Sequence, residues 1–217
     1  MMVAIIILLL LIGFSARAGL SYVAQYRVNA AIDRWQLSSD KKTSLSDWQN
    51  LFASLETMLA IDGGNPDLHN AKARLYAYRA GKIDTDSGQR SEDYKQAMQG
   101  YRTVIALRPA WPYGYVNLLY AKVFNGELDA EMQHSLLRAI KLSPWEKNTL
   151  PDIVKVAVFV WPSLDMESKK VAKAYLLEAS EKRRGEFEKA LKSSQLKDYF
   201  CQTIVKTDRL TLCQPAS

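Results

Sequence analysis

Few side chains in this sequence have the types and spacing that acid–base, nucleophilic or metal chemistry requires. The chain has two histidines, His69 and His134, and neither is followed by a metal ligand three or four positions later. Gly63 and Gly64 are followed by Asn-Pro and lack the lysine of a phosphate-binding loop, and no Gly-x-Ser-x-Gly pattern occurs. We therefore predict a protein that is not an enzyme, with no catalytic, cofactor-binding or metal-binding residues.

The two cysteines are the first exception to this scarcity of reactive residues. Cys201 and Cys213 are separated by 11 residues near the C-terminus. A disulfide between them would close a short loop and stabilise the fold by roughly 3 kcal/mol on the chain-entropy model. Such a bond persists outside the reducing cytosol. We predict this disulfide, and the alternative is a pair of unrelated thiols.

The second exception is a cluster of aromatic and basic residues. Aromatic rings stack on sugar C–H surfaces or peptide side chains and lose little rotamer entropy in doing so. Tyr113 and Tyr120 are seven residues apart and are expected on a core face, whereas Tyr115 lies off that face. Structural packing is the favoured interpretation for the whole set, and a ligand groove is the alternative. The predicted partner or glycan surface consists of Arg108, Trp111, Tyr115, Lys122 and Trp145.

Composition excludes several classes of protein. The chain has 217 residues, of which 48% are hydrophobic and 24% charged, which excludes a disordered chain. The net charge of +6 comes from scattered residues of both signs, whereas nucleic-acid binding requires a clustered basic face. The many Ala, Leu, Lys, Glu and Gln residues favour helix. We therefore predict an all-α protein that does not bind nucleic acid.

The N-terminal segment has the character of a membrane anchor. Residues 1–16 carry no charge, and Ile5 to Ile12 is an unbroken aliphatic run. Apolar character resumes after Arg17, whose side chain can snorkel, so a span of about 20 residues is reachable. A cleaved signal peptide is the alternative, because Ala16-Arg17-Ala18 has the small-x-small form of a cleavage site. We assign residues 1–24 to this anchor or signal.

The signals for topology conflict. Basic residues such as Arg17, Arg27 and Arg34 follow the span, which by the positive-inside rule would place the body in the cytoplasm. The predicted disulfide favours the opposite side. We expect a single-pass membrane protein with its body on the exported side of the membrane, and a cytoplasmic body is the alternative.

Helical periodicity continues through the rest of the chain. We predict a helical stalk or linker over 25–42, helical repeats over 43–145, and C-terminal helices with a cysteine-stapled tail over 146–217. Thr43 or Ser44 is expected to cap the first body helix. Residues 81–90 are predicted to form a loop, 151–161 a buried helix or, on β-propensity, a strand, and 186–200 a last helix after a break at Gly185.

An internal repeat links the middle helices. The pattern Ala97-x3-Tyr101-x2-Val104-x4-Pro109 recurs 35 residues later, starting at Met132 and ending at Pro144. An earlier copy starts at Ser54. Stacked helical hairpins explain such a period, because a lone helix pair cannot bury its apolar stripe.

This pattern resembles the tetratricopeptide repeat over about residues 44–145. The second helices match well, and Tyr113 and Tyr120 occupy the family's aromatic positions. Asn117 and Arg74 stand where the family has Gly or Ala, so the repeats are degenerate. The resemblance implies a degenerate α-solenoid whose groove binds partner proteins.

The whole chain also resembles the VpsP-like accessory proteins of bacterial exopolysaccharide operons. The resemblance rests on the apolar N-terminus, the late cysteine pair and the segments Arg108–Tyr113 and Leu142–Glu146. It implies a role in polysaccharide synthesis or export. We therefore predict a scaffold that is anchored in the bacterial inner membrane with its body in the periplasm, binds proteins of an envelope assembly and requires no cofactor. Two alternatives stay open, namely a module that binds polysaccharide directly and an adaptor in another envelope or secretion assembly.

Overall fold

The computed structural model describes residues 2–37, 44–206 and 211–214. The described residues form helices joined by short turns and contain no strand, so the all-α prediction is confirmed for this part of the chain. The chain divides into two compact units, Met1–Arg108 and Pro109–Ser217. The first unit contains α1 (Met2–Leu37), α2 (Leu45–Ile61), α3 (Pro66–Lys82) and α4 (Ser87–Leu107).

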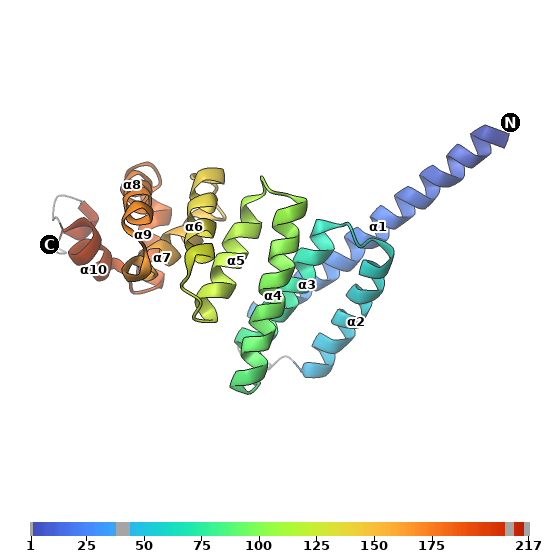
Figure 1. Cartoon of the computed structure of the whole chain (residues 1–217), viewed down its shortest axis with the longest axis horizontal. Helices are drawn as coiled ribbons and strands as arrows, with labels where there is room; N and C mark the ends of the chain where they lie inside the picture. Colours follow the sequence, from blue (N-terminus) through green and yellow to red (C-terminus); the bar gives the residue numbers. More distant parts are fainter. Residues whose placement is uncertain (1, 38–43, 207–210, 215–217) are drawn as a thin grey trace. The chain divides into compact units, whose positions relative to one another are not determined.

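Helix α1 combines a free apolar part with a part that belongs to the core of the first unit. Its N-terminal residues are exposed, and the helix is long and apolar enough to cross a membrane. Farther along, Ala24, Val28 and Ile32 are buried. They pack in one apolar cluster with residues of α2 and α3, namely Trp48, Leu55, Leu68, Ala71, Leu75 and Tyr78. The helix runs unbroken from one part to the other (Figure 1).

Local capping signals define where several helices begin. The Ser44 side chain accepts a hydrogen bond from the backbone N–H of Asp47, as predicted, while Thr43 lies outside the described residues. Asp86 caps α4 in the same way by accepting from the Gln89 N–H at 2.9 Å. This cap starts α4 at Ser87, so the predicted loop over 81–90 is wrong at both ends, because α3 also extends to Lys82.

Helices α3 and α4 approach each other closely at one glycine. A Cβ atom added to Gly100 would lie only 2.8 Å from the Cβ of Ala73, so only glycine fits there without a shift of the helices. Arg74, which stands where the tetratricopeptide pattern has a small residue, instead faces α1. Its guanidinium group donates to Asn29 at 2.5 Å and to Asp33 at 3.3 Å. This arginine therefore joins α3 to α1.

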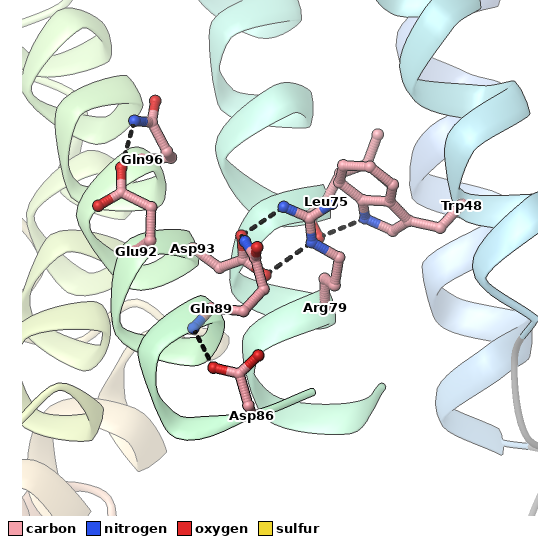
Figure 2. A network of polar contacts seen from close by, with 8 residues as sticks. All are labelled: Trp48, Leu75, Arg79, Asp86, Gln89, Glu92, Asp93 and Gln96. Atoms are coloured by element: carbon pink, nitrogen blue, oxygen red, sulfur yellow. Dashed lines mark hydrogen bonds and ion pairs between the residues drawn. The ribbon is translucent and has the colours of Figure 1, made fainter. Parts of the chain in front are cut away.

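A polar network connects α2, α3 and α4 (Figure 2). The indole N–H of Trp48 donates to the carbonyl oxygen of Leu75 at 2.8 Å, and the Arg79 guanidinium lies 4.0 Å from the centre of a Trp48 ring. On its other side Arg79 pairs with Asp93 through two hydrogen bonds, one of them 2.6 Å long. Asp93 is fully buried and also accepts from Gln89 at 2.8 Å. Arg79, which belongs to α3, therefore contacts both α2 and α4 through its guanidinium group.

The second unit is built from further helices, and some of them pack on helices that are not their neighbours in sequence. They are α5 (Pro112–Phe124), α6 (Ala130–Leu142), α7 (Leu150–Phe159), α8 (Met166–Lys182), α9 (Arg184–Ser193) and α10 (Lys197–Tyr199), followed by a π-helical turn, Phe200–Val205. Helices α5 and α6 form a hairpin whose turn contains Gly126 at φ 77°, as the Asn125-Gly126 sequence predicts. The apolar segment that could have been a strand is the buried helix α7.

The internal repeat is structural in two of its three copies. Ala97, Tyr101 and Val104 are buried in α4, and the equivalent residues Met132, Leu136 and Ala139 are buried in α6. In the earlier copy, Ser54 is exposed and Ile61 is 54% exposed, so this segment does not repeat the buried face. The register of α2 is set instead by Trp48 and Leu55, which pack against α1 and α3.

Two predicted boundaries near the C-terminus are wrong. The break between α8 and α9 falls at Arg183, and Gly185 lies within α9. The predicted helix over 186–200 is interrupted after Ser193, where Gln195 has φ 57°. The hydroxyl of Ser194 donates to the Ala190 carbonyl at 2.8 Å, and such side-chain bonds compete with continuation of a helix.

Candidate functional site

The five residues of the predicted aromatic–basic surface fall in both units. Arg108 ends the first unit and forms a bidentate pair with Asp67, with N–O distances of 2.7 and 2.9 Å. Trp111 is half-buried in the second unit, with its ring 5.2 Å from that of Tyr113. Trp145 is also half-buried, stacks on Tyr175 at 6.1 Å, and has the Lys182 ammonium 4.9 Å from its ring centre.

Tyr115 is a packing residue in this structure. Its side chain is buried, its hydroxyl donates to the carbonyl oxygen of Pro109 at 3.2 Å, and the Arg138 guanidinium lies 5.5 Å from its ring centre. Tyr113 and Tyr120, which were expected in the core, are only half-buried. The expectation that Tyr115 lies off the core face is therefore wrong.

Lys122 is also inaccessible to a partner, since 1% of its surface is exposed. Its ammonium group contacts carboxylates of Glu127, Asp129 and Glu131 at 3.0, 2.9 and 2.8 Å. Burial by itself lowers the pKa of Lys122, but hydrogen bonds to Glu131, Asp129 and Glu127 outweigh burial and hold that pKa above its usual value. Lys122 therefore joins α5 to the α5–α6 turn and the start of α6.

We expect Lys122→Met to lower the free energy of unfolding of the second unit by about 2–3 kcal/mol. This is less than the roughly 3–5 kcal/mol for breaking a fully buried pair, because the three carboxylates remain partly hydrated. Burial raises the pKa of Asp129, but hydrogen bonds from the Met132 N–H and from Lys122 outweigh burial and hold that pKa below its usual value. The loss should therefore shrink in acid, as Asp129 is protonated and its pairing with Lys122 disappears. Urea denaturation of both proteins at several pH values measures this difference.

The matched control is Lys189→Met, since Lys189 is exposed on α9. We expect a change within about 0.5 kcal/mol for it. An equally small effect of Lys122→Met at neutral pH would contradict the role of Lys122 as a structural tie.

The structure joins Cys201 and Cys213 in a disulfide with a Cα–Cα distance of 5.6 Å. The bond fastens the short helical turn Thr211–Cys213 to the π-helical turn that contains Cys201. Next to Cys201, Phe200 is fully buried and packs edge-on against Phe187 of α9 at 5.2 Å. The bond thus ties the C-terminal tail to the core of the second unit.

We expect reduction of this disulfide to destabilise the second unit by roughly 2–3 kcal/mol, because the bond then no longer restricts the unfolded chain by closing a short loop. The measurement is urea denaturation of the wild-type chain with and without reductant. The double variant Cys201→Ser, Cys213→Ser should match the reduced wild type and should not respond to reductant. A wild type that is equally stable with and without reductant would show that the bond contributes nothing.

A groove between α1 and α2 is a hollow that sequence reasoning missed. It has a volume of ≈ 840 Å³ and is confined to the first unit. Helix α1 contributes Arg27 and Arg34, which are seven residues apart and exposed, and the half-buried Trp35, whose ring lies 5.1 Å from Tyr78. The facing residues of α2 are Asp47, Asn50 and Leu51.

Comparisons with protein-family models, with curated proteins and with solved structures found no match to this chain.

The groove presents charged, aromatic and aliphatic side chains to a ligand. In the described ranges, no three His, Cys, Asp or Glu side chains come together in a way that could hold a metal ion. With two arginines against the single carboxylate of Asp47, the groove carries an excess of positive charge beside aromatic and aliphatic surface, which suits a protein segment bearing acidic and apolar side chains. The signal in the sequence was the seven-residue spacing of Arg27 and Arg34, but nothing there showed that α2 would lie beside them.

Proposed function

We propose that this protein is a membrane-anchored adaptor, without catalytic activity of its own, that binds a partner protein in the α1–α2 groove. The assembly we favour is one in the bacterial envelope that synthesises or exports an exopolysaccharide, and another envelope or secretion assembly is the alternative. The body lies in the periplasm on this proposal, and the Cys201–Cys213 disulfide supports an oxidising compartment.

The observation that carries the proposal is the double role of α1. Its N-terminal part is long, apolar and exposed, while Val28 and Ile32 of the same unbroken helix lie in the core of the first unit. Because no flexible linker separates these two parts, a bilayer that holds the apolar part also fixes the groove at one distance from its surface. A fixed recognition surface beside a membrane suits an adaptor better than an enzyme that must release products.

Site-specific photo-crosslinking in cells tests the groove. A photoreactive amino acid at Arg27 or Asn50 should give the same discrete protein adduct, and an added Arg34→Glu substitution should weaken both adducts. The control position is Lys95, which is exposed on α4 and does not line the groove. Equal adducts from Lys95, or no protein adduct from either groove position, would contradict the proposal.

A second candidate function is direct binding of a glycan by the second unit. The observation that favours it is the pair of half-buried tryptophans, Trp111 and Trp145, each beside a tyrosine ring. This candidate predicts that an oligosaccharide changes the tryptophan fluorescence of the wild type and not of a Trp111→Leu, Trp145→Leu variant. An unchanged wild-type spectrum at millimolar oligosaccharide would remove it.

A further inference from the structure

The end of the first unit from which the apolar part of α1 emerges is held together by Asp62. The carboxylate of Asp62 accepts a hydrogen bond from the Ser21 hydroxyl at 2.7 Å and another from the Asn65 amide at 2.8 Å. It also pairs with the Nε of Arg17 at 3.4 Å. Hydrogen bonds from Asn65 and Ser21, together with the charge of Arg17, hold the pKa of Asp62 below its usual value. The α2–α3 turn is therefore fastened to α1 at the level of residues 17–21.

The exposed apolar part of α1 ends immediately before Arg17. Phe14 is 65% exposed and lies three residues before Arg17, a distance of about 4.5 Å along the helix axis. The headgroup layer on each side of a bilayer is about 5–8 Å thick. If the apolar part lies in the hydrocarbon core, the α2–α3 turn consequently lies within the headgroup layer.

The side chains exposed at this end are of the kinds found at membrane surfaces. Ile61 ends α2 and is 54% exposed, and Leu107 ends α4 and is 43% exposed. The pair between Arg108 and Asp67 fixes the end of α4 beside the start of α3. On α1, Tyr22 is 63% exposed. Tyrosines are enriched at the level of lipid headgroups because one end of the ring is apolar and the other polar.

A cavity of ≈ 360 Å³ opens at the same end. Phe14 and Tyr22 supply apolar surface to this cavity. Its charged residues are two arginines and two aspartates, namely Arg17, Arg108, Asp62 and Asp67. Each guanidinium is paired with one carboxylate and keeps further N–H groups that this pairing does not use. The cavity has no net charge, so it gives a purely anionic group little attraction and matches a group that carries both signs.

We propose that this end of the first unit, formed by residues 14–22, the α2–α3 turn and the end of α4, docks on the bilayer that α1 enters. The cavity takes the headgroup of a zwitterionic phospholipid, whose phosphate accepts hydrogen bonds from Arg17 and Arg108 and whose ammonium faces Asp62 and Asp67. This inference rests on the proposed membrane anchoring. It adds a lipid-binding role for the folded body, which anchoring alone does not require.

Spin labels on the full-length chain in lipid nanodiscs test the docking. Both native cysteines are in the disulfide, so Ile61→Cys, Leu45→Cys and Leu10→Cys each provide a single reactive thiol. Ile61 and Leu45 lie at opposite ends of α2, about 24 Å apart. We expect collisions with oxygen and with a nickel chelate to place label 10 in hydrocarbon, label 61 in the headgroup layer and label 45 in water.

The three labels separate failure of this inference from failure of the proposed function. Label 10 in hydrocarbon with labels 61 and 45 equally accessible to the nickel chelate would overturn the docking and leave the anchoring intact. Label 10 in water would overturn the anchoring itself, and the docking with it.

Native mass spectrometry tests the headgroup. The full-length chain is extracted from vesicles that contain equal amounts of phosphatidylethanolamine and phosphatidylglycerol. We expect the wild type to retain one phosphatidylethanolamine and the double variant Arg17→Gln, Arg108→Gln to lose it. The control Arg90→Gln, at the other end of α4, should keep it. Preferential retention of phosphatidylglycerol, or equal retention of phosphatidylethanolamine in all three proteins, would overturn the assignment of the cavity.

Discussion

Val28→Asp unfolds the first unit, because it places a carboxylate in the apolar cluster shared by α1, α2 and α3. Val28 is 1% exposed and packs in the same cluster as Trp48 and Leu75. A buried charge without a partner destabilises by more than about 4 kcal/mol, a large part of the stability of a small domain. The full-length chain in detergent should therefore lose its first cooperative transition in thermal circular dichroism, and its α2–α3 region should become sensitive to protease.

The control is Tyr26→Asp in the same helix. Tyr26 is 61% exposed, so the same aspartate remains hydrated there and should change stability by less than about 1 kcal/mol. Equal stability of the two variants would mean that this part of α1 is a spacer outside the folded body, and the rigid connection between span and body would be lost with it.

Arg79→Ala should destabilise the first unit by about 3–5 kcal/mol, the usual cost of leaving a buried charge without its partner. Asp93 is fully buried, and the remaining hydrogen bond from Gln89 cannot neutralise its carboxylate. The substitution also removes the guanidinium that lies over the Trp48 ring. Urea denaturation followed by tryptophan fluorescence measures the loss.

A double variant separates loss of the Arg79–Asp93 pair from general disruption of the fold. The variant Arg79→Met, Asp93→Leu removes both charges and should recover much of the stability lost in Arg79→Ala, because no buried charge remains. The control is Arg184→Ala, which breaks an exposed pair with Glu188 and should cost less than about 0.5 kcal/mol. A loss in Arg79→Ala as small as that would contradict the network in Figure 2.

The features that were predictable from the sequence are those that depend on neighbouring residues. Ser44 as a cap, Gly126 at a left-handed turn and the helical character of residues 150–159 follow from local rules of capping and turn chemistry. The repeat at α4 and α6 was predictable because both helices bury the same three positions. The pairing of Cys201 with Cys213 was predictable because the chain has no other cysteine.

The site was much less predictable, because it depends on contacts between segments far apart in the chain. The sequence predicts Lys122 on a recognition surface, whereas its ammonium group is enclosed by the carboxylates of residues 127, 129 and 131, which are the local signal for its burial. Nothing in the sequence pairs Asp62 with Ser21, which lies 41 residues away. The earlier repeat copy at Ser54 matched by residue type alone, and the packing of α2 on α1 overrode it.

Thiol labelling in intact bacterial cells is the most direct test of the proposal that the protein is anchored in the inner membrane with its body in the periplasm. A membrane-impermeant maleimide is applied to the wild-type chain before and after reduction, and Cys201→Ser, Cys213→Ser serves as the unlabelled control. We predict labelling of Cys201 and Cys213 only after reduction, without permeabilisation of the cells. Labelling that requires permeabilisation and no reductant would place free thiols in the cytoplasm and contradict the account.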